Sequence, residues 1–166
     1  HIKWLYSCWG SDLFYYQSNL IHKLKIKEVL KRVNLIHTDC NRDYELAKSL
    51  GFKGDFSVLI PGGSGYDLEL VKEYIKPISD RRIILVKGYE HQFGRAINVL
   101  KAIEGIDRKV FEKYEIVVFG AHQKVIDYIK NNNFNCSYYT RHELNNFQIL
   151  ELMGSSLIYI GNSISD

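Results

Sequence analysis

The stretch RIILVKGYEHQFGRAINVLKAI (82–103) decides the fold class of this chain. It starts as an apolar run, turns at Gly88, and after Gly94 places apolar residues at the spacing of one helix face as far as Ile103. The order is strand, glycine-containing turn and helix. A stretch of this kind predicts one strand–helix unit of a parallel α/β sheet.

The same order returns as far as the last residues of the sequence. Further strands are predicted over 115–121, 136–140 and 157–161, with helices over 122–133 and 142–154 between them. The segment EIVVFGA (115–121) is almost entirely apolar, which is typical of a parallel strand buried on both faces. Four strands alternating with three helices predict a doubly wound unit, which binds ligands at the carboxyl ends of its strands.

The N-terminal part carries a shorter α/β pattern. Strands are predicted over 2–9, 34–40 and 55–61, and helices over 23–33 and 42–50. In the first of these helices the apolar residues that recur near helical spacing are Leu24, Val29, Leu30 and Val33.

Residues 62–80 contain three glycines and Pro77 and show no sustained periodicity. We expect this segment to be the hinge and crossover between two α/β units that meet at a cleft. The predicted domains are residues 1–78 and residues 79–166.

Composition excludes several classes of protein. Hydrophobic residues make up 46% and charged residues 25%, as in ordinary globular proteins. The net charge of +3 is too small to indicate nucleic-acid binding but suits an anionic small ligand. Three cysteines without a CxxC pair predict reduced thiols, a cytoplasmic location and no metal site. No apolar run is long enough to span a bilayer.

The turn KGYEHQFGRA (87–96) is the first candidate site. Gly88 and Gly94 open a helix whose backbone N–H groups would face a phosphate, and Lys87 and Arg95 flank the turn. We expect Arg95 to be the main cationic contact of a diphosphate, with Lys87 second, because arginine offers a bidentate fork. Alternatively, the glycines only shape a tight turn and Arg95 is solvated.

Three more loops follow predicted strands and should leave the same sheet edge, together with 87–95. The candidate ligand contacts in these loops, 120–123, 140–144 and 161–166, are His122, Arg141, Glu143, Ser163 and Ser165. Each has a structural alternative. His122 can cap the next helix, Thr140 and Glu143 can form a capping box, and 161–166 can be an ordinary loop.

In the first unit, WGSD (9–12) places Trp9, Gly10 and Asp12 at the end of a predicted strand. A sugar ring can stack on Trp9 and hydrogen-bond to the Asp12 carboxylate. Trp9 can equally belong to the core.

Taken in order, these elements resemble the family 4 glycosyltransferases, which have the GT-B fold of two facing Rossmann-like domains. WGSD (9–12) is similar to the loop after an acceptor-side strand of the family. VLIPGGSGYD (58–67) resembles the segment that leads into its second domain, and 83–103 resembles the opening of its donor domain. SISD (163–166) resembles the segment shortly before the donor-binding glutamate. The resemblance covers nearly the whole chain.

The resemblance implies a retaining, hexosyltransferase-like enzyme of polysaccharide biosynthesis. It would move a sugar from a nucleotide-sugar to a glycan or lipid-linked acceptor, without cofactor or metal. The family's cationic GR…KG pair appears as Gly88-Tyr89 and Phe93-Gly94, so Lys87 and Arg95 would serve from shifted positions. The resemblance also implies a protein of the cytoplasm that associates peripherally with the inner face of the membrane. The donor-binding glutamates would follow Asp166, so we expect this chain alone to be inactive; its catalytic residues stay unassigned.

Two alternatives remain open. A nucleotide-sugar epimerase on the same architecture would need a pair of acid/base carboxylates, and the sequence offers no convincing pair. A non-catalytic nucleotide-sugar-binding or scaffold subunit would keep the fold without the chemistry. The departures at Trp9 and Tyr89 favour this second alternative.

Overall fold

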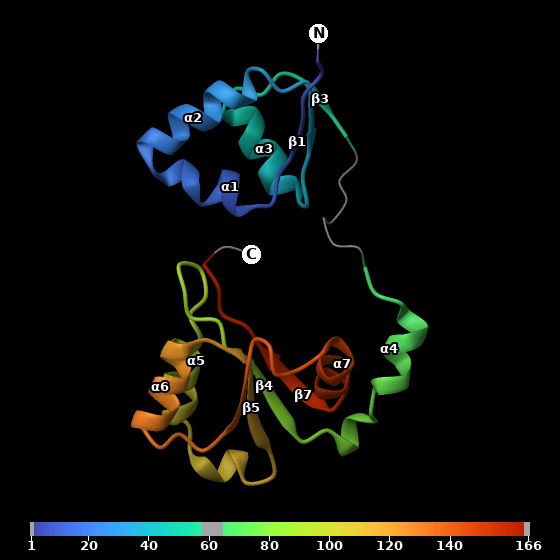
Figure 1. Cartoon of the computed structure of the whole chain (residues 1–166), viewed down its shortest axis with the longest axis vertical. Helices are drawn as coiled ribbons and strands as arrows, with labels where there is room; N and C mark the ends of the chain where they lie inside the picture. The colour runs from blue at the N-terminus through green and yellow to red at the C-terminus, as the bar shows by residue number, and fades with distance from the viewer. Residues whose placement is uncertain (1, 58–64, 165–166) are drawn as a thin grey trace. The chain divides into compact units, whose positions relative to one another are not determined.

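The computed structural model describes residues 2–57 and 65–164. They form two compact units that divide between Gly65 and Tyr66, inside the segment predicted to be the hinge. Each unit has its own parallel β-sheet with helices around it (Figure 1). The predicted α/β class with two parallel sheets is therefore confirmed, and each unit is compatible with a Rossmann-like arrangement.

The first unit contains a three-stranded parallel sheet in the order β1-β2-β3. Its elements are β1 (Leu5–Ser7), α1 (Ser11–Phe14), the 3-10 turn η1 (Tyr16–Ser18), α2 (Leu20–Leu30), β2 (Leu35–His37), α3 (Asn41–Ser49) and β3 (Asp55–Phe56). The strands are shorter than predicted, and residues 58–61 of the third predicted strand lie outside the described part of the chain. The core of this unit contains Leu13, Leu30, Ile36 and Ala47, which are fully buried.

Helix α2 differs from the helix predicted over 23–33. It begins at Leu20 because the Asn19 side chain accepts hydrogen bonds from two N–H groups of the first turn. Only part of the predicted apolar face is buried. Leu30 and Val33 reach the core, whereas Leu24 is 60% exposed.

The second unit contains a four-stranded sheet in which every strand is parallel to its neighbours. Its elements are α4 (Leu68–Tyr74), the 3-10 turn η2 (Ile78–Asp80), β4 (Ile83–Lys87), α5 (Ala96–Glu104), the 3-10 turn η3 (Arg108–Phe111), β5 (Glu115–Ala121), α6 (Gln123–Asn131), β6 (Ser137–Thr140), α7 (Asn146–Gly154) and β7 (Ser156–Ile160). The predicted alternation of four strands with three helices after residue 81 is confirmed.

The strand order of this sheet is β6-β5-β4-β7. From β4 the chain passes to β5 and β6 on one side, and then returns to the other side of β4. Helices α5 and α6 cover one face of the sheet and α7 covers the other (Figure 1). The order reverses between β4 and β7, which makes this pair of strands the topological switch point, the place where open α/β sheets form a ligand crevice.

Helix α4 belongs to the second unit, although the sequence-based boundary at residue 78 places it in the first domain. A Cβ atom on Gly154 of α7 would lie 2.0 Å from the carbonyl oxygen of Tyr74, so only glycine permits this close approach. The Lys76 N–H also donates to the Gly154 carbonyl oxygen at 3.1 Å. The end of α4 is thus fixed directly against α7.

The described helices include none with the length and apolar character needed to cross a membrane.

Candidate functional site

The four loops predicted to share one sheet edge do so. Each follows a strand of the same parallel sheet, and we call the edge where β4, β5, β6 and β7 end the carboxyl edge. Thr140 at the end of β6 pairs in register with Ala121 at the end of β5. Of the predicted contacts, Ser165 lies outside the described residues.

The loops after β4 and β7 are joined directly at the switch point. Gly94 and Ser163 form an antiparallel bridge. The Arg95 N–H donates to the Asn162 carbonyl oxygen at 3.0 Å, and the Ile164 N–H donates to the loop after β4. The sequence therefore brings the first and last of its predicted loops together, as a short ribbon over the switch point.

Gly88 fixes the loop after β4 against the end of β5. A Cβ at this position would lie 2.7 Å from the Ala121 Cα, closer than a side chain allows. The Gly88 N–H donates to the Phe119 carbonyl oxygen, and the Gly88 carbonyl accepts from the His122 N–H at 3.0 Å. The tight-turn role of Gly88 is thus present in the structure.

Three rings gather above this turn, and we call Tyr89, His91 and His122 the ring cluster. The Tyr89 ring stacks on His122, with centroids 5.2 Å apart, and the His91 ring lies 5.3 Å from His122. Gly120, at φ +62°, leaves room for Tyr89, because a Cβ there would lie 2.7 Å from the Tyr89 ring. The Lys87 ammonium lies 4.7 Å above the Tyr89 ring centroid. Lys87 and His122 therefore both contact the Tyr89 ring.

Arg95 holds the conformation of its own loop. It precedes the first residue of α5, whereas the sequence places it inside the first turn of the helix. Its Nη1 donates to the carbonyl oxygens of His91 at 2.7 Å and Gly94 at 2.8 Å. At least this nitrogen of the fork serves the protein rather than a ligand.

The N-terminus of α5, predicted to bind phosphate, is occupied by Glu90. A carboxylate oxygen of Glu90 accepts from the Ile97 N–H at 2.9 Å. The Ala96 N–H donates to the Tyr89 carbonyl oxygen. A negative side chain therefore already compensates the positive end of the helix, and a diphosphate would have to displace it or lie beside it.

The capping box predicted for Thr140 and Glu143 belongs to a different pair of residues. Helix α7 begins at Asn146, later than predicted, and Asn145 and Gln148 form its capping box. Glu143 instead accepts from the Thr140 N–H within the preceding turn, and this bond lowers the pKa of the exposed Glu143 carboxyl. Arg141, in the same turn, is exposed.

In the first unit, the Asp12 carboxylate is used by the protein itself. It accepts from the Tyr6 hydroxyl and from the N–H groups of Trp9 and Leu13, the latter two at 3.0 and 3.1 Å. Gly10 between them has a φ of +79°, which favours glycine. Trp9 is 76% exposed, so it does not belong to the core. Trp9 is available to stack on a ligand, whereas Asp12 shapes the loop.

An ion pair that the sequence did not single out lies beside this loop. Asp43 is buried and accepts two hydrogen bonds from Arg42, at 2.8 and 3.2 Å. Their hydrogen bond raises the pKa of Arg42. The Arg42 guanidinium also lies 3.9 Å above the ring of Phe14, which fixes α3 against α1. Adjacent residues of opposite charge are too common in sequences to reveal such a pair.

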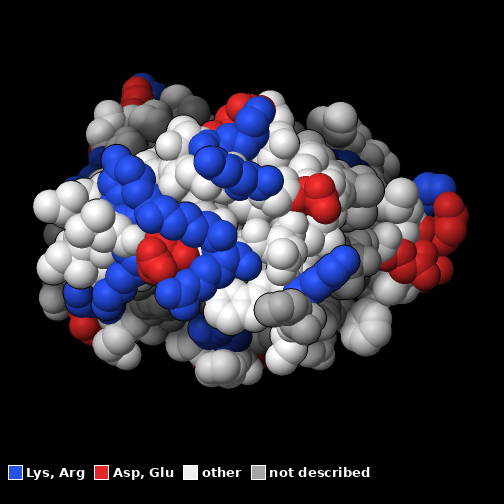
Figure 2. Space-filling view, turned by 90° about the horizontal axis from the view of Figure 1, so that it is seen from above, with Lys and Arg blue, Asp and Glu red and all other residues white. Residues whose placement is uncertain are grey.

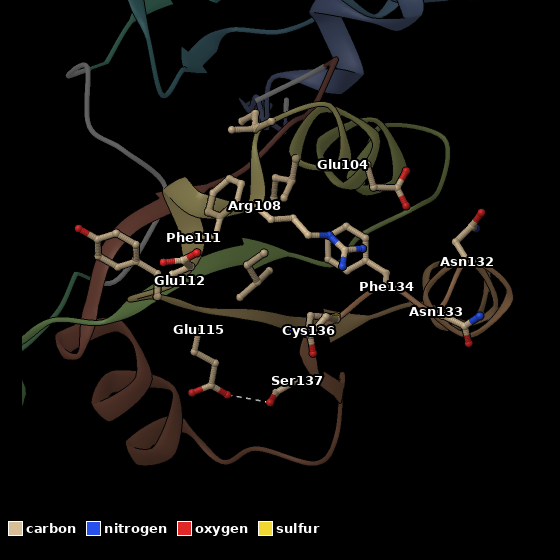
Figure 3. A pocket seen from close by; sticks show the side chains of 15 residues that line it. Glu104, Arg108, Phe111, Glu112, Glu115, Asn132, Asn133, Phe134, Cys136 and Ser137 are labelled. Atoms are coloured by element: carbon tan, nitrogen blue, oxygen red, sulfur yellow. Dashed lines mark hydrogen bonds between the residues drawn. The ribbon is translucent and has the colours of Figure 1, made fainter.

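A hollow of about 760 Å³ lies at the opposite edge of the second unit's sheet, where β5 and β6 begin (Figure 3). Its charged lining residues are Glu104, Arg108, Glu112 and Glu115. Glu115 accepts a hydrogen bond from Ser137 at 2.7 Å. Three carboxylates against one guanidinium disfavour a diphosphate, so this hollow does not compete with the carboxyl edge as a nucleotide site.

Within residues 2–57 and 65–164, no group of three or more His, Cys, Asp or Glu side chains is placed to hold a metal ion. No family model, curated protein or solved structure matches the chain. Function therefore has to be inferred from the geometry. Glu90, Tyr89 and His91 are additions to the predicted site. The one available signal for Glu90 was that it is the only acidic residue in the turn 87–96.

Proposed function

We propose that this chain is part of a retaining glycosyltransferase and that its second unit binds the nucleotide-sugar donor at the carboxyl edge. The observation that carries the proposal is the reversal of strand order between β4 and β7, with the loops after these strands bridged through Gly94 and Ser163. Ligands of open α/β sheets bind at such a point.

The chemistry of the neighbouring side chains suits a nucleoside diphosphate. Lys87, the last residue of β4, and Arg95, on the loop that follows, are half-buried cations that can balance the charge of a diphosphate. Helix α6 starts at the same edge without a side-chain cap, so its first N–H groups face the same region. The exposed His91 ring offers a flat surface to a base or sugar.

A second candidate function is a nucleotide-sugar-binding subunit without catalysis. It is favoured by the engagement of two carboxylates next to the candidate sites. Glu90 compensates the end of α5, and Asp12 accepts hydrogen bonds from its own loop. Neither is placed to act as an acid or base in this conformation.

The experiment is a calorimetric titration of the chain with nucleoside diphosphates and nucleotide-sugars. Lys87→Met removes a cation that makes no hydrogen bond to a backbone carbonyl of residues 2–57 or 65–164, so the loop should keep its shape. Loss of one charged contact should weaken binding by about tenfold or more. Lys101→Met, in the last turn of α5, is the matched control and should bind as the wild type does.

Arg95→Ala is less informative alone, because Arg95 also holds its loop closed. If neither the wild-type chain nor Lys87→Met binds any nucleotide, the proposed donor site is wrong. The alternative outcome is that the chain binds nucleotide-sugars but transfers no sugar to any of a panel of acceptors, even as part of a longer protein. The non-catalytic subunit is then the better description.

A further inference from the structure

The two histidines of the ring cluster each use one ring nitrogen to hold the loop after β4. The Nδ1 of His122 lies 3.2 Å from the Glu90 carbonyl oxygen. A carbonyl oxygen only accepts hydrogen bonds, so this Nδ1 carries the proton, and the Nε2 of the neutral ring is an acceptor. The Nδ1 of His91 accepts instead from the Phe93 N–H at 3.1 Å. The neutral His91 ring therefore carries its proton on Nε2, which is a donor.

The two Nε2 atoms remain available to a ligand. Neither has a hydrogen-bond partner within the described parts of the chain, residues 2–57 and 65–164. The two ring centroids are 5.3 Å apart, and the ring planes are tilted by 34°. His91 is exposed, and His122 is half-buried where α6 begins. The carboxyl edge thus presents one donor and one acceptor on neighbouring rings.

The groups of a nucleotide-sugar suit these two atoms differently. An ionised phosphate oxygen only accepts hydrogen bonds, so it would meet the lone pair of the His122 Nε2 with no proton between them. A hydroxyl group both donates and accepts. Two neighbouring hydroxyls of a sugar ring can therefore satisfy the donor on His91 and the acceptor on His122 at the same time.

We propose that His91 and His122 recognise sugar hydroxyls of the nucleotide-sugar, with His122 as acceptor and His91 as donor. This inference rests on the proposed function and assigns separate groups of the ligand to separate residues, because the diphosphate falls to Lys87. The Tyr89 ring, stacked on His122 with centroids 5.2 Å apart, fixes the orientation of the acceptor. The hydroxyls belong either to the ribose or to the transferred sugar, and the test separates these two sources.

Asparagine at each position removes Nε2 and keeps the bond to the loop. The asparagine amide branches from Cγ, as the imidazole does. In His122→Asn the amide N–H can still donate to the Glu90 carbonyl oxygen, and in His91→Asn the amide oxygen can still accept from the Phe93 N–H. The matched control is His22→Asn, which changes an exposed histidine of the first unit.

The experiment is calorimetric titration at pH 8, where a histidine side chain is ordinarily neutral. UDP-glucose, ADP-glucose and GDP-mannose are titrated first. The one that binds is then compared with analogues that each lack one hydroxyl of the ribose or of the sugar. Lys and Arg side chains outweigh Asp and Glu on the face shown in Figure 2 and would attract any nucleotide. Because the analogues carry the same charge as the parent ligand, this attraction cancels.

Loss of one neutral hydrogen bond should weaken binding about three- to tenfold. The analogue without the recognised hydroxyl should bind the wild type and His22→Asn more weakly by this factor. His122→Asn or His91→Asn should bind that analogue and the parent ligand equally, since the contact is already lost. Coupling with a ribose analogue assigns the ribose, and coupling with a sugar analogue assigns the transferred sugar.

Nuclear magnetic resonance of the ¹⁵N-labelled chain checks the two tautomers without any ligand. Two-bond ¹H–¹⁵N correlations should place the proton on Nδ1 of His122 and on Nε2 of His91, and the reverse tautomer at His122 would overturn the proposal. If no nucleotide-sugar binds, the donor site itself is wrong and this inference falls with it. If one binds, but each analogue loses the same factor in the wild type and in both variants, the donor site stands and the histidine contacts are refuted.

Discussion

Replacing Glu90 by glutamine tests the assignment of the α5 N-terminus. Glutamine keeps an oxygen that can accept from the Ile97 N–H but removes the charge at the helix end. A carboxylate at this position contributes about 0.3–1 kcal/mol when exposed and up to about 2 kcal/mol when partly buried. Because Glu90 is half-buried, we expect the free energy of unfolding of the second unit to fall by about 1 kcal/mol.

A change of about 1 kcal/mol corresponds to a lower Tm of about 4–8 °C for a domain of this size. Thermal unfolding followed by circular dichroism measures it, and the difference should shrink at high salt because salt screens the helix dipole. Glu112→Gln, an exposed carboxylate of the same unit, is the control and should leave the Tm unchanged. A Tm for Glu90→Gln within about one degree of the wild type would refute the stabilising role of Glu90.

The same variant locates the diphosphate. If the diphosphate of a nucleotide-sugar lies near the N-terminus of α5, removing the neighbouring negative charge should tighten binding by about tenfold. Unchanged affinity in a chain that is nevertheless destabilised would place the diphosphate elsewhere on the carboxyl edge, with the N-terminus of α6, which has no side-chain cap, as the next candidate.

Two further predictions concern local packing and pH. Gly120→Ala should lower the free energy of unfolding of the second unit by about 1–3 kcal/mol, because position 120 has a positive φ and the added Cβ would clash with the Tyr89 ring. In a Tyr89→Ala background the loss should be smaller, since the clash is removed. Equal losses in the two backgrounds would contradict this explanation. Burial raises the pKa of the Cys8 thiol to about 12 and that of Cys136 to about 11. Iodoacetamide at pH 8 should therefore label both at least about 100-fold more slowly than in the unfolded chain, which mass spectrometry of the labelled peptides measures. Because the folded pKa of Cys8 lies above the unfolded value, its contribution to stability is present at neutral pH and is lost as the pH rises from about 8.5 towards 12.

The second unit was predictable because its local and long-range signals agree. The run EIVVFGA (115–121) became β5 with the predicted bounds, and Ile116, Val117, Val118 and Ala121 are buried. The four loops were expected at one edge because parallel strands leave no other arrangement. Within these loops, a glycine between a strand and a helix predicted a tight turn at Gly88, and the structure has the Gly88 backbone close to Ala121.

The apolar pattern of α2 was misleading for a physical reason. Leu24 and Leu30 are six residues apart, so their side chains point about 120° apart around the helix axis. They do not share one face, and Leu24 is 60% exposed whereas Leu30 is buried. In the first unit, α2 packs against the core through Ile26 and Leu30. The face that carries Leu24 stays exposed.

Three charged residues of the candidate sites have a local role in common. Arg95, Glu143 and Asp12 were each predicted to contact a ligand, and each makes hydrogen bonds to the backbone of its own loop. Loops that leave a sheet edge contain many backbone N–H and C=O groups without a backbone partner, and nearby charged side chains form hydrogen bonds with these groups. Charged residues that make no such hydrogen bond are therefore better candidates for ligand binding. The Lys87 ammonium lies over the Tyr89 ring and makes no hydrogen bond to a loop carbonyl among the described residues. On the carboxyl edge this criterion therefore favours Lys87 over Arg95 as the first contact of a diphosphate.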